Sequence, residues 1–526
     1  MAIIISNIVL PLTEPPEQAI AAALRRLGSP AVKSAEIARK AVDARRRPQI
    51  RFVYSVSVEC ENEEELLAKY EAPQIRRVIT PKLNVKPVGA ALSSRPVIVG
   101  FGPAGIFAGL MLARSGYCPI ILERGAAVEE RVKSVESFWQ TGKLDTKTNV
   151  QFGEGGAGTF SDGKLNTRIG DARCRFVLEE LVKHGAPAEI LYQAKPHIGT
   201  DLLRGVVREI RKEIIALGGE IRFMTALTGL GIKSGKLVGA STENGELEAE
   251  VLILAPGHSA RDTFKLLKES GVMLEPKAFS VGARIEHHQK DIDTALYGSA
   301  AGNPLLPPGE YALSLRQNNR AVYTFCMCPG GLVVPAASEE GMLVTNGMSE
   351  FGRNRDNANA ALVVSVSPED FGADALAGVD FQRKLEQAAF AAGGGAYKAP
   401  AQTVGGFLGN KAKIGNVSPS YAIGVRECDL SGVLPGAVTD MMRDGLLDFG
   451  RKLRGFNSDS AVLTGVETRT SSPVRIPRDK DSMQSIAVEG LYPCGEGAGY
   501  AGGIMSAAVD GLAVAEIIIS KNSPAK

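Results

Sequence analysis

The chain has 526 residues, 44% of them hydrophobic, which is enough for roughly two to four domains with buried cores. Its 60 Lys and Arg residues nearly balance 58 Asp and Glu residues, so the overall charge does not indicate a nucleic-acid or membrane partner. Seven cysteines over this length argue against a disulfide framework and favour a reducing compartment. No stretch approaches the ~20 apolar residues of a membrane span, and we expect a cytoplasmic protein.

Residues 1–90 are expected to form a small N-terminal α+β domain. Ile3–Val9 is interpreted as a strand rather than a signal peptide, because it lacks a basic n-region and a cleavage site. The patterns predict a helix over Pro16–Leu27 and a second helix over Ala31–Arg45. Alternating apolar residues in Ile50–Val58 predict a strand with one buried face.

The segment Arg25–Arg51 is basic, with nine Lys or Arg residues, among them Arg45, Arg46 and Arg47. Such a patch is typical of a surface that binds RNA or an acidic partner. The alternative is a solvated face set against the acidic residues that follow it. A linker containing prolines, Pro81–Ser94, then leads to the next domain.

A glycine-rich turn follows the apolar strand Pro96–Val99 and precedes a predicted helix, Ile106–Ser115. Gly100 allows a tight turn, Gly102 lets the backbone approach a pyrophosphate, and Gly105 lets the helix pack closely on the strand. Phosphates would lie at the helix N-terminus, where free N–H groups favour negative charge. The turn therefore predicts one half of an FAD site, which also includes Pro103, Ala104 and, further along, Arg124.

A second apolar strand, Pro119–Leu122, completes this βαβ unit and ends at Glu123. An acid about twenty residues after the glycines is placed to bond an adenosine ribose hydroxyl. A glycine-rich structural turn without a ligand is the alternative.

The loop Phe152–Asn166 is rich in glycine, so its backbone can lie close to a ligand. We predict that it forms a third wall of the site, with Lys164 bonding the flavin or staying in solvent. A flexible surface loop is the alternative. The predicted cofactor contacts here are Gly156, Ser161, Lys164 and Asn166.

The strand Val251–Leu254 ends in a small-residue turn containing Pro256 and Gly257. This turn resembles the one that returns to the nucleotide in flavoproteins with two dinucleotide folds, with Pro256 where Thr is usual. Residues 263–465 carry no nucleotide signature and are expected to form an inserted α+β substrate or cap domain. We find no second G-x-G-x-x-G for a separate NADPH domain.

The closing half of the predicted site is Y-P-C-G-E-G-A-G-Y-A-G-G-I, Tyr492–Ile504, after a predicted strand over Ile486–Pro493. Glu496 is placed to bond a ribityl hydroxyl. The helix that starts near Ile504 can aim its N–H groups at the flavin edge, where negative charge gathers on reduction. The predicted contacts are Gly495, Glu496, Gly502, Gly503 and Ile504.

Candidates for the chemistry are Lys164, Arg469 and Arg475, and the catalytic residues are otherwise unassigned. The cations and hydroxyl groups around Arg469 and Arg475 suit the binding of an anionic substrate or of a charged flavin edge. The alternative is that each arginine pairs with a structural carboxylate. Cys326 and Cys328 would share one side of a strand. They form a redox pair, meet the substrate, or are free buried thiols; their spacing does not indicate a metal site.

Five motifs resemble those of uncharacterised bacterial FAD-dependent dehydrogenases, an NAD(P)/FAD-dependent oxidoreductase family. They are F-G-E-G-G-A-G-T-F-S-D-G-K-L (Phe152–Leu165), G-H-S-A-R-D (Gly257–Asp262), C-M-C-P-G-G (Cys326–Gly331), E-T-R-T-S-S-P (Glu467–Pro473) and G-E-G-A-G-Y-A-G-G-I (Gly495–Ile504). More distantly, the chain is similar to BaiN-like flavoproteins, whose loop S-G-x-G-R-C-N would fall on Ser161–Asn166, with Lys164 in place of Arg and Leu165 in place of Cys.

The resemblance implies an α/β fold with a glutathione-reductase-type, Rossmann-like FAD-binding domain and an inserted domain, and it implies no substrate. We therefore expect an N-terminal domain at 1–90, FAD-binding parts at 91–262 and 466–526, and an insertion at 263–465. The expected function is hydride transfer between FAD and a small molecule, with NAD(P)H as a transient reductant. A flavin-dependent RNA-modifying protein and a non-catalytic flavin-binding protein are the alternatives.

Overall fold

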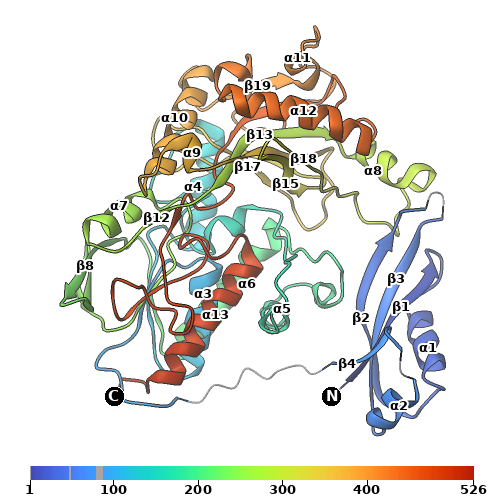
Figure 1. Cartoon of the computed structure of the whole chain (residues 1–526), viewed down its shortest axis with the longest axis horizontal. Coiled ribbons are helices and arrows are strands. Elements are labelled where there is room, and N and C mark those ends of the chain that lie inside the picture. The colour runs from blue at the N-terminus through green and yellow to red at the C-terminus, as the bar shows by residue number, and fades with distance from the viewer. Residues whose placement is uncertain (1, 47–48, 71, 79–86, 526) are drawn as a thin grey trace.

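In the computed structural model of the chain, the structure describes residues 2–46, 49–70, 72–78 and 87–525. A five-stranded parallel sheet, in the order β23-β11-β5-β6-β7, lies in the lower part of Figure 1. Its inner strands are buried apolar triplets, as expected for a parallel sheet covered on both faces. The strands are β5 (Val97–Val99), β6 (Ile120–Leu122), β7 (Glu220–Arg222), β11 (Leu252–Leu254) and β23 (Leu491–Pro493).

The two faces of this sheet are covered differently, because alternate side chains point to opposite sides. Ile98, Ile121 and Ile253 pack into one core with the helices, and Val97 and Val99 pack into another with a three-stranded antiparallel sheet. The helices are α3 (Pro103–Arg114), α5 (Arg173–Lys183), α6 (Thr200–Ala216) and α13 (Ile504–Lys521). The small sheet comprises β8 (Leu227–Lys233), β9 (Lys236–Thr242) and β10 (Gly245–Glu248).

Helices α3 and α13 lie side by side although they come from distant parts of the chain (Figure 1). A Cβ added to Gly511 on α13 would lie 2.1 Å from the Ala104 carbonyl oxygen on α3. A Cβ added to Gly105 would lie 1.9 Å from the Gly100 carbonyl oxygen, which confirms the close packing of α3 on β5. Glycine at these positions therefore lets both helices begin at the same edge of the sheet.

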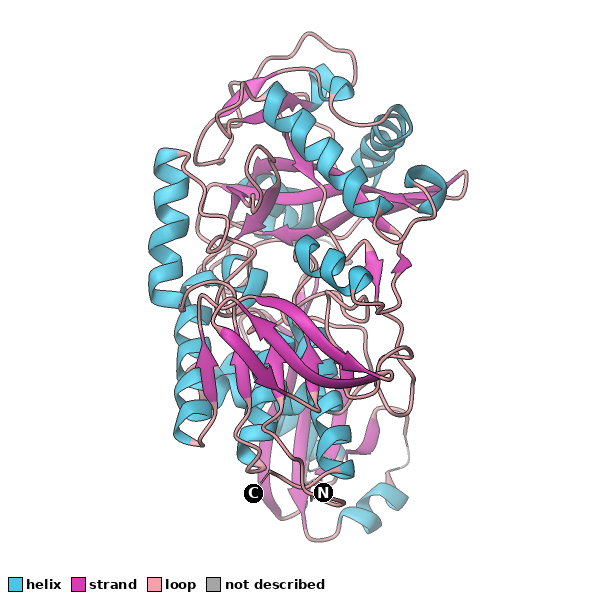
Figure 2. Cartoon of the chain, turned by 90° about the vertical axis from the view of Figure 1, so that its left-hand side faces the viewer, coloured by secondary structure: helices cyan, strands magenta, loops and turns pink. Residues whose placement is uncertain are grey.

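A seven-stranded sheet forms the upper part of the molecule (Figure 2), in the order β14-β15-β18-β13-β21-β19-β20. Its strands are β13 (Phe279–His288), β14 (Ser314–Gln317), β15 (Arg320–Cys328), β18 (Asn357–Val366), β19 (Ala399–Thr403), β20 (Val425–Glu427) and β21 (Val462–Glu467). Its helices are α8 (Gln289–Tyr297), α9 (Pro368–Phe371), α10 (Ala377–Ala392), α11 (Val404–Phe407) and α12 (Gly436–Lys452).

Two further helices and two short two-stranded ribbons complete this part of the chain. The helices are α4 (Val128–Thr141) and α7 (Arg261–Glu269). The ribbons pair β16 (Leu332–Pro335) with β17 (Thr345–Met348), and β12 (Glu275–Pro276) with β22 (Val474–Arg475). The predicted strand over Ile486–Pro493 is mostly wrong, because only β23 forms a strand and Gly490, with φ +86°, turns the chain just before it.

The N-terminal segment forms a four-stranded sheet with helices on one side. Its elements are β1 (Ala2–Pro11), α1 (Glu17–Arg26), β2 (Val32–Asp43), β3 (Arg51–Cys60), α2 (Glu63–Lys69) and β4 (Ile75–Val78). The predicted helix over Ala31–Arg45 is wrong, because this stretch pairs along β3 as strand β2 and that pairing overrides its Ala, Lys and Arg content. The expected linker Pro81–Ser94 lies partly outside the described residues.

Among the described residues, every helix is too short or too polar to cross a membrane.

Gly511→Ala tests the packing of α13 on α3. The new methyl group would meet backbone that cannot swing aside, so we expect the free energy of unfolding to fall by about 1–3 kcal/mol. Denaturant unfolding measures this change. Gly205→Ala on α6 is the matched control, because no atom lies within 4 Å of its added Cβ; it should be neutral or stabilising by up to about 1 kcal/mol. Equal stabilities of the two variants would contradict the packing.

Candidate functional site

A cavity of about 350 Å³ lies at the carboxyl ends of the parallel strands, the edge where ligands bind in such sheets. It brings together the two predicted half-sites, the loop Phe152–Asn166 and the segment that follows β21. Of the sequence-predicted residues, these line it: Gly100, Gly102, Pro103, Ala104, Glu123, Arg124, Gly156, Ser161, Lys164, Asn166, Pro256, Gly257, Arg469, Gly495, Glu496, Gly502, Gly503 and Ile504.

Two predicted residues lie outside the cavity lining. Gly105 faces strand β5, where its role is the close packing described above. Arg475 is exposed, and its guanidinium lies 5.1 Å from the centre of the Tyr500 ring. Arg475 is therefore not placed to contact a molecule in this cavity.

The turn before α3 has the backbone that its glycines require. Gly100 has φ +98°, and a Cβ there would lie 2.2 Å from the Ala255 carbonyl oxygen. Gly102 is the N-cap of α3 and has no side chain to bond the free N–H groups of the first turn. A Cβ on Gly156 would lie 3.1 Å from the Cα of Gly102, so two bare backbones face each other in the wall.

Helix α13 also directs an N-terminus with a glycine cap toward the cavity. Gly503 caps it with φ +120° and no side-chain hydrogen bond to the first turn. An added Cβ on Gly502 or Gly503 would meet no atom within 4 Å, so open space lies beside this backbone. Two uncapped helix N-termini thus direct partial positive charge into one cavity, an arrangement that suits an anionic ligand.

Glu123 is 5% exposed and its carboxylate accepts three backbone hydrogen bonds. The donors are the N–H groups of Phe101 (2.9 Å), Gly125 (2.9 Å) and Gly153 (3.0 Å). The carboxylate therefore ties the glycine-rich turn to the third wall while it lines the cavity. Contact with a ribose hydroxyl stays a prediction, since this fastening role accounts for the burial of the side chain.

The third wall is held in place by Arg131, which is fully buried on α4. Its guanidinium donates to the carbonyl oxygens of Asn149, Val150, Glu154 and Gly156 at 2.6–3.0 Å. These bonds fix the glycine-rich segment as a rigid wall, so the alternative of a flexible surface loop does not describe its first half.

Lys164 faces both the cavity and a carboxylate. Its ammonium lies 3.2 Å from Glu310, and Arg353 bridges Glu310 at 2.7 Å to Asp162. The neighbouring cations hold the pKa of Glu310 down at about 2, although burial alone would raise it. Lys164 is therefore a charged group held at the cavity wall rather than a solvated side chain.

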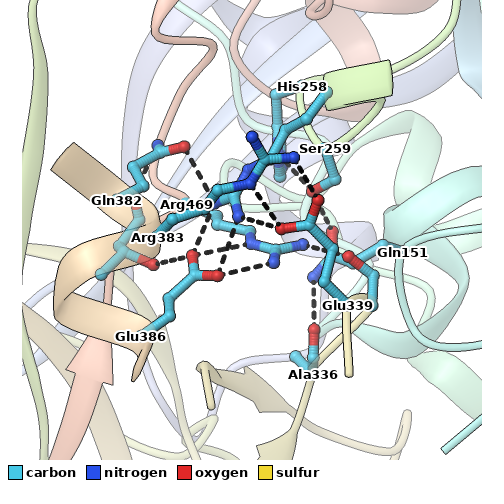
Figure 3. A network of polar contacts seen from close by, with 12 residues as sticks. Gln151, His258, Ser259, Ala336, Glu339, Gln382, Arg383, Glu386 and Arg469 are labelled. Carbon is cyan, nitrogen blue, oxygen red and sulfur yellow. Dashed lines mark hydrogen bonds and ion pairs between the residues drawn. The ribbon is translucent and has the colours of Figure 1, made fainter. Parts of the chain in front are cut away.

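Arg469 belongs to a buried ionic network beside the cavity (Figure 3). Glu386 on α10 lies 2.9 Å from Arg469 and 2.6 Å from Arg261 at the start of α7, and Glu339 lies 2.7 Å from Arg261. Although burial opposes it, the pairing with both arginines holds the pKa of Glu386 below its usual range. Arg469 is thus paired with a structural carboxylate, and it also lines the cavity. Its contact with an anionic substrate or a flavin edge stays a prediction.

His258, in the turn that follows β11, lines the cavity beside this network (Figure 3). Burial, with Arg469 and Arg261 nearby, lowers the pKa of His258 to about 3. The imidazole is therefore neutral at physiological pH and bonds the Ser259 hydroxyl at 3.0 Å.

Glu496 lines the opposite side of the cavity. Burial raises the pKa of Glu496 to about 7, Lys277 opposes this shift, and Cys326 adds to it. A carboxyl group with this pKa can hold or release a proton near neutral pH. Its predicted bond to a ribityl hydroxyl remains a prediction.

Several lining residues were not found by sequence reasoning, because only the pairing of distant strands brings them to the cavity. They are Thr225, Phe325 and Asn346. Cys326 also lines the cavity, and contact of this thiol with a substrate was one of the alternatives that the sequence left open.

The basic N-terminal residues are spread over three elements: Arg25 and Arg26 end α1, Lys33, Arg39 and Lys40 lie on β2, and Arg51 begins β3. Lys40 lies 4.3 Å from the centre of the Phe52 ring, and Arg45 bonds Asp43 at 2.7 Å. Arg47 lies outside the described residues. RNA binding by this segment stays a prediction.

Comparison with known proteins places the upper sheet in a described family. Residues 278–470 match a family model described as "FAD-dependent protein, C-terminal domain-like", and residues 2–59 match a domain of unknown function. The chain thus contains a domain of FAD-dependent proteins. Over 492 residues it is 51% identical to an uncharacterized protein of Clostridium beijerinckii, covering 92% of each chain. The chain belongs to the same family as that protein.

Solved flavoproteins share only a distant likeness. Glycine oxidase from Geobacillus kaustophilus is 12% identical, with 82% of this chain and 95% of that chain covered and a TM-score of 0.35. A geranylgeranyl bacteriochlorophyll reductase-like protein from Thermoplasma acidophilum is 13% identical, with coverages of 80% and 77% and a TM-score of 0.34. These low scores carry no conclusion about function.

Glu386→Ala tests the ionic network. It leaves Arg261 and Arg469 buried without their shared carboxylate, so we expect the free energy of unfolding to fall by about 3–5 kcal/mol. Asp380→Ala, on the same helix, removes an ion pair of 3.8 Å from a side chain that is 68% exposed, and should change stability by less than about 0.5 kcal/mol. Chemical denaturation compares the two variants, and similar losses would contradict the account.

Glu496→Gln tests the raised pKa in flavin-free protein. The native state binds the Glu496 proton more tightly than the unfolded chain, whose Glu pKa is about 4.3. The free energy of unfolding of the wild type, relative to that of the variant, should therefore fall as the pH rises from about 4.3 to about 7, and then level off. The expected change is about 3–4 kcal/mol, since each unit of pKa difference corresponds to about 1.4 kcal/mol. Denaturant unfolding at a series of pH values measures it; a difference independent of pH would refute the shift.

Proposed function

We propose that the protein is an FAD-dependent oxidoreductase whose cavity binds FAD and a small-molecule substrate. The observation that carries this proposal is the meeting of two uncapped helix N-termini at one glycine-walled cavity. The match of residues 278–470 to a family of FAD-dependent proteins supports it. Bound FAD would accept a hydride from the substrate or donate one to it.

The residues present fit this cofactor. The bare backbones of Gly102 and Gly156 leave room for a pyrophosphate against the N-terminus of α3. The open space beside Gly502 and Gly503 leaves room for a ring system against the N-terminus of α13. The partial positive charge at that end would favour the negative charge of a reduced flavin edge.

The arrangement also supports a glutathione-reductase-type FAD fold. The turn from β5 to α3 and the segment from β23 to α13 join one sheet, and the chain shows no second glycine fingerprint. We infer that NAD(P)H, if it is the reductant, binds transiently rather than in its own dinucleotide fold. Lys164 and Arg469 at the wall favour an anionic substrate.

Gly102→Val tests where the cofactor binds. A Cβ at Gly102 would lie 3.7 Å from the Gly156 Cα, an ordinary contact, so the variant should fold while its methyl groups fill the space for the pyrophosphate. We expect purified wild type to carry FAD or take it up on reconstitution, and the variant to retain less than about a tenth of it.

Gly436→Val is the control, because this glycine begins α12 and has no atom within 4 Å of an added Cβ; it should keep its flavin. Flavin absorbance per protein and circular dichroism measure binding and folding. A well-folded Gly102→Val protein with full FAD content would overturn the placement. In wild type, anaerobic bleaching of the flavin by NADH or NADPH would support the oxidoreductase, whereas a flavin that no donor or substrate reduces would favour a non-catalytic binding protein.

A further inference from the structure

Strand β15 contains an irregularity at the cavity. Its register with β18 runs regularly to Phe325 opposite Ala361 and then resumes at Cys328 opposite Asn359. Cys326 and Met327 therefore share the place of one residue, as in a β-bulge. Cys326 has φ +43°, a left-handed conformation that is strained for a non-glycine residue. This bulge places Cys326 in the cavity lining.

The bulge also brings two thiols together. Cys326 is partly exposed to the cavity, whereas Cys328 is completely buried behind it, with its Sγ 3.4 Å from the Cys326 carbonyl oxygen. In a regular strand, alternate Cα atoms lie about 6.7 Å apart, near the upper limit for a disulfide. The Cys328 thiol nevertheless lies within hydrogen-bond reach of the Cys326 side chain, so the arrangement suits one accessible thiol and one resolving thiol.

Arg284, Lys164 and the carboxylate of Asp162 lie near the accessible thiol, and the two cations lower its pKa more than Asp162 raises it. Arg284 is fully buried and donates a hydrogen bond of 2.9 Å to the Cys326 carbonyl oxygen. Lys164 lines the same cavity. A hydrogen bond from the Cys328 thiol, with Arg284 and Lys164 nearby, holds the pKa of Cys326 below its ordinary value against the effect of burial. Cys326 is thus suited to react as a thiolate.

A second hollow, of about 460 Å³, adjoins the cavity that Cys326 lines. It shares Phe325, Thr470 and Gly502 with the first cavity. Arg316 and Tyr323 line it and offer a cation and a hydroxyl to a polar molecule. A small thiol or disulfide compound with a carboxylate group would fit this chemistry.

We propose that Cys326 and Cys328 form a redox-active dithiol that exchanges electrons with small thiol or disulfide compounds and with FAD. The thiolate of Cys326 attacks a small disulfide, one sulfur of which leaves as a thiol after taking up a proton. Cys328 loses its proton and attacks the Cys326 sulfur, which forms the Cys326–Cys328 bond and releases the second thiol.

The compound thus gains two electrons and two protons, and the protein loses them. Reduced flavin would supply two electrons and two protons to reopen the disulfide. This last step depends on the proposed FAD binding, whereas the thiol chemistry itself does not.

The test uses the full chain with and without FAD, and glutathione disulfide as the probe. After incubation with the probe and alkylation, peptide mapping by mass spectrometry should show a Cys326–Cys328 disulfide in both forms. Cys328→Ser should instead accumulate a mixed disulfide with glutathione on Cys326. At pH 7, iodoacetamide should alkylate Cys326 at least roughly tenfold faster than Cys428, the partly exposed internal reference.

Anaerobic dithiothreitol should reduce bound flavin in wild type at least roughly tenfold faster than in Cys326→Ser, and Cys428→Ser should behave as wild type. Thiols that stay reduced with the probe, or a Cys326 no more reactive than Cys428, would overturn the dithiol whether or not FAD binds. Equal flavin reduction in wild type and Cys326→Ser would overturn the electron exchange. A protein that forms the disulfide but takes up no FAD would contradict the proposed function and the exchange with FAD, and it would support the dithiol chemistry with small disulfides.

Discussion

The close packing of α3 against α13 is the constraint on which the candidate site depends. Gly511 and Gly105 leave no room for side chains, so the two helices approach each other and strand β5 at backbone distance. This approach places both helix N-termini at one edge of the parallel sheet, and neither end has a side-chain cap. Unpaired N–H groups at two helix ends are a cost that an anionic ligand can offset.

Buried arginines then complete the walls around those two ends. Arg131 fixes the glycine-rich loop through backbone carbonyl oxygens, and Glu386 on α10 holds together Arg261, at the start of α7, and Arg469, just after β21. Arg284 and Glu467 link the neighbouring strands β13 and β21. Each guanidinium has several hydrogen-bond partners, which a buried charge requires. The cavity is therefore rigid on its electropositive side, and its position between the two large sheets follows from these ionic contacts.

The parts of the site that local chemistry determines could be predicted from the sequence. The turn at Gly100, the loop at Gly156 and the helix entrance at Gly503 each have a positive φ that favours glycine, and all three line the cavity. Strand β2 was mistaken for a helix, because its pairing with β3 decides its structure. The partners of Arg469 and the bulge at Cys326 depend on strands and helices distant in sequence, and no local pattern reveals such pairing.

A crystal structure of the protein grown with FAD tests the central claim most directly. The account predicts density for the pyrophosphate against the N-terminus of α3, and for the flavin ring between the N-terminus of α13 and the side of the cavity that Cys326 lines. Density for the flavin at another place, or an empty cavity in protein saturated with FAD, would contradict it.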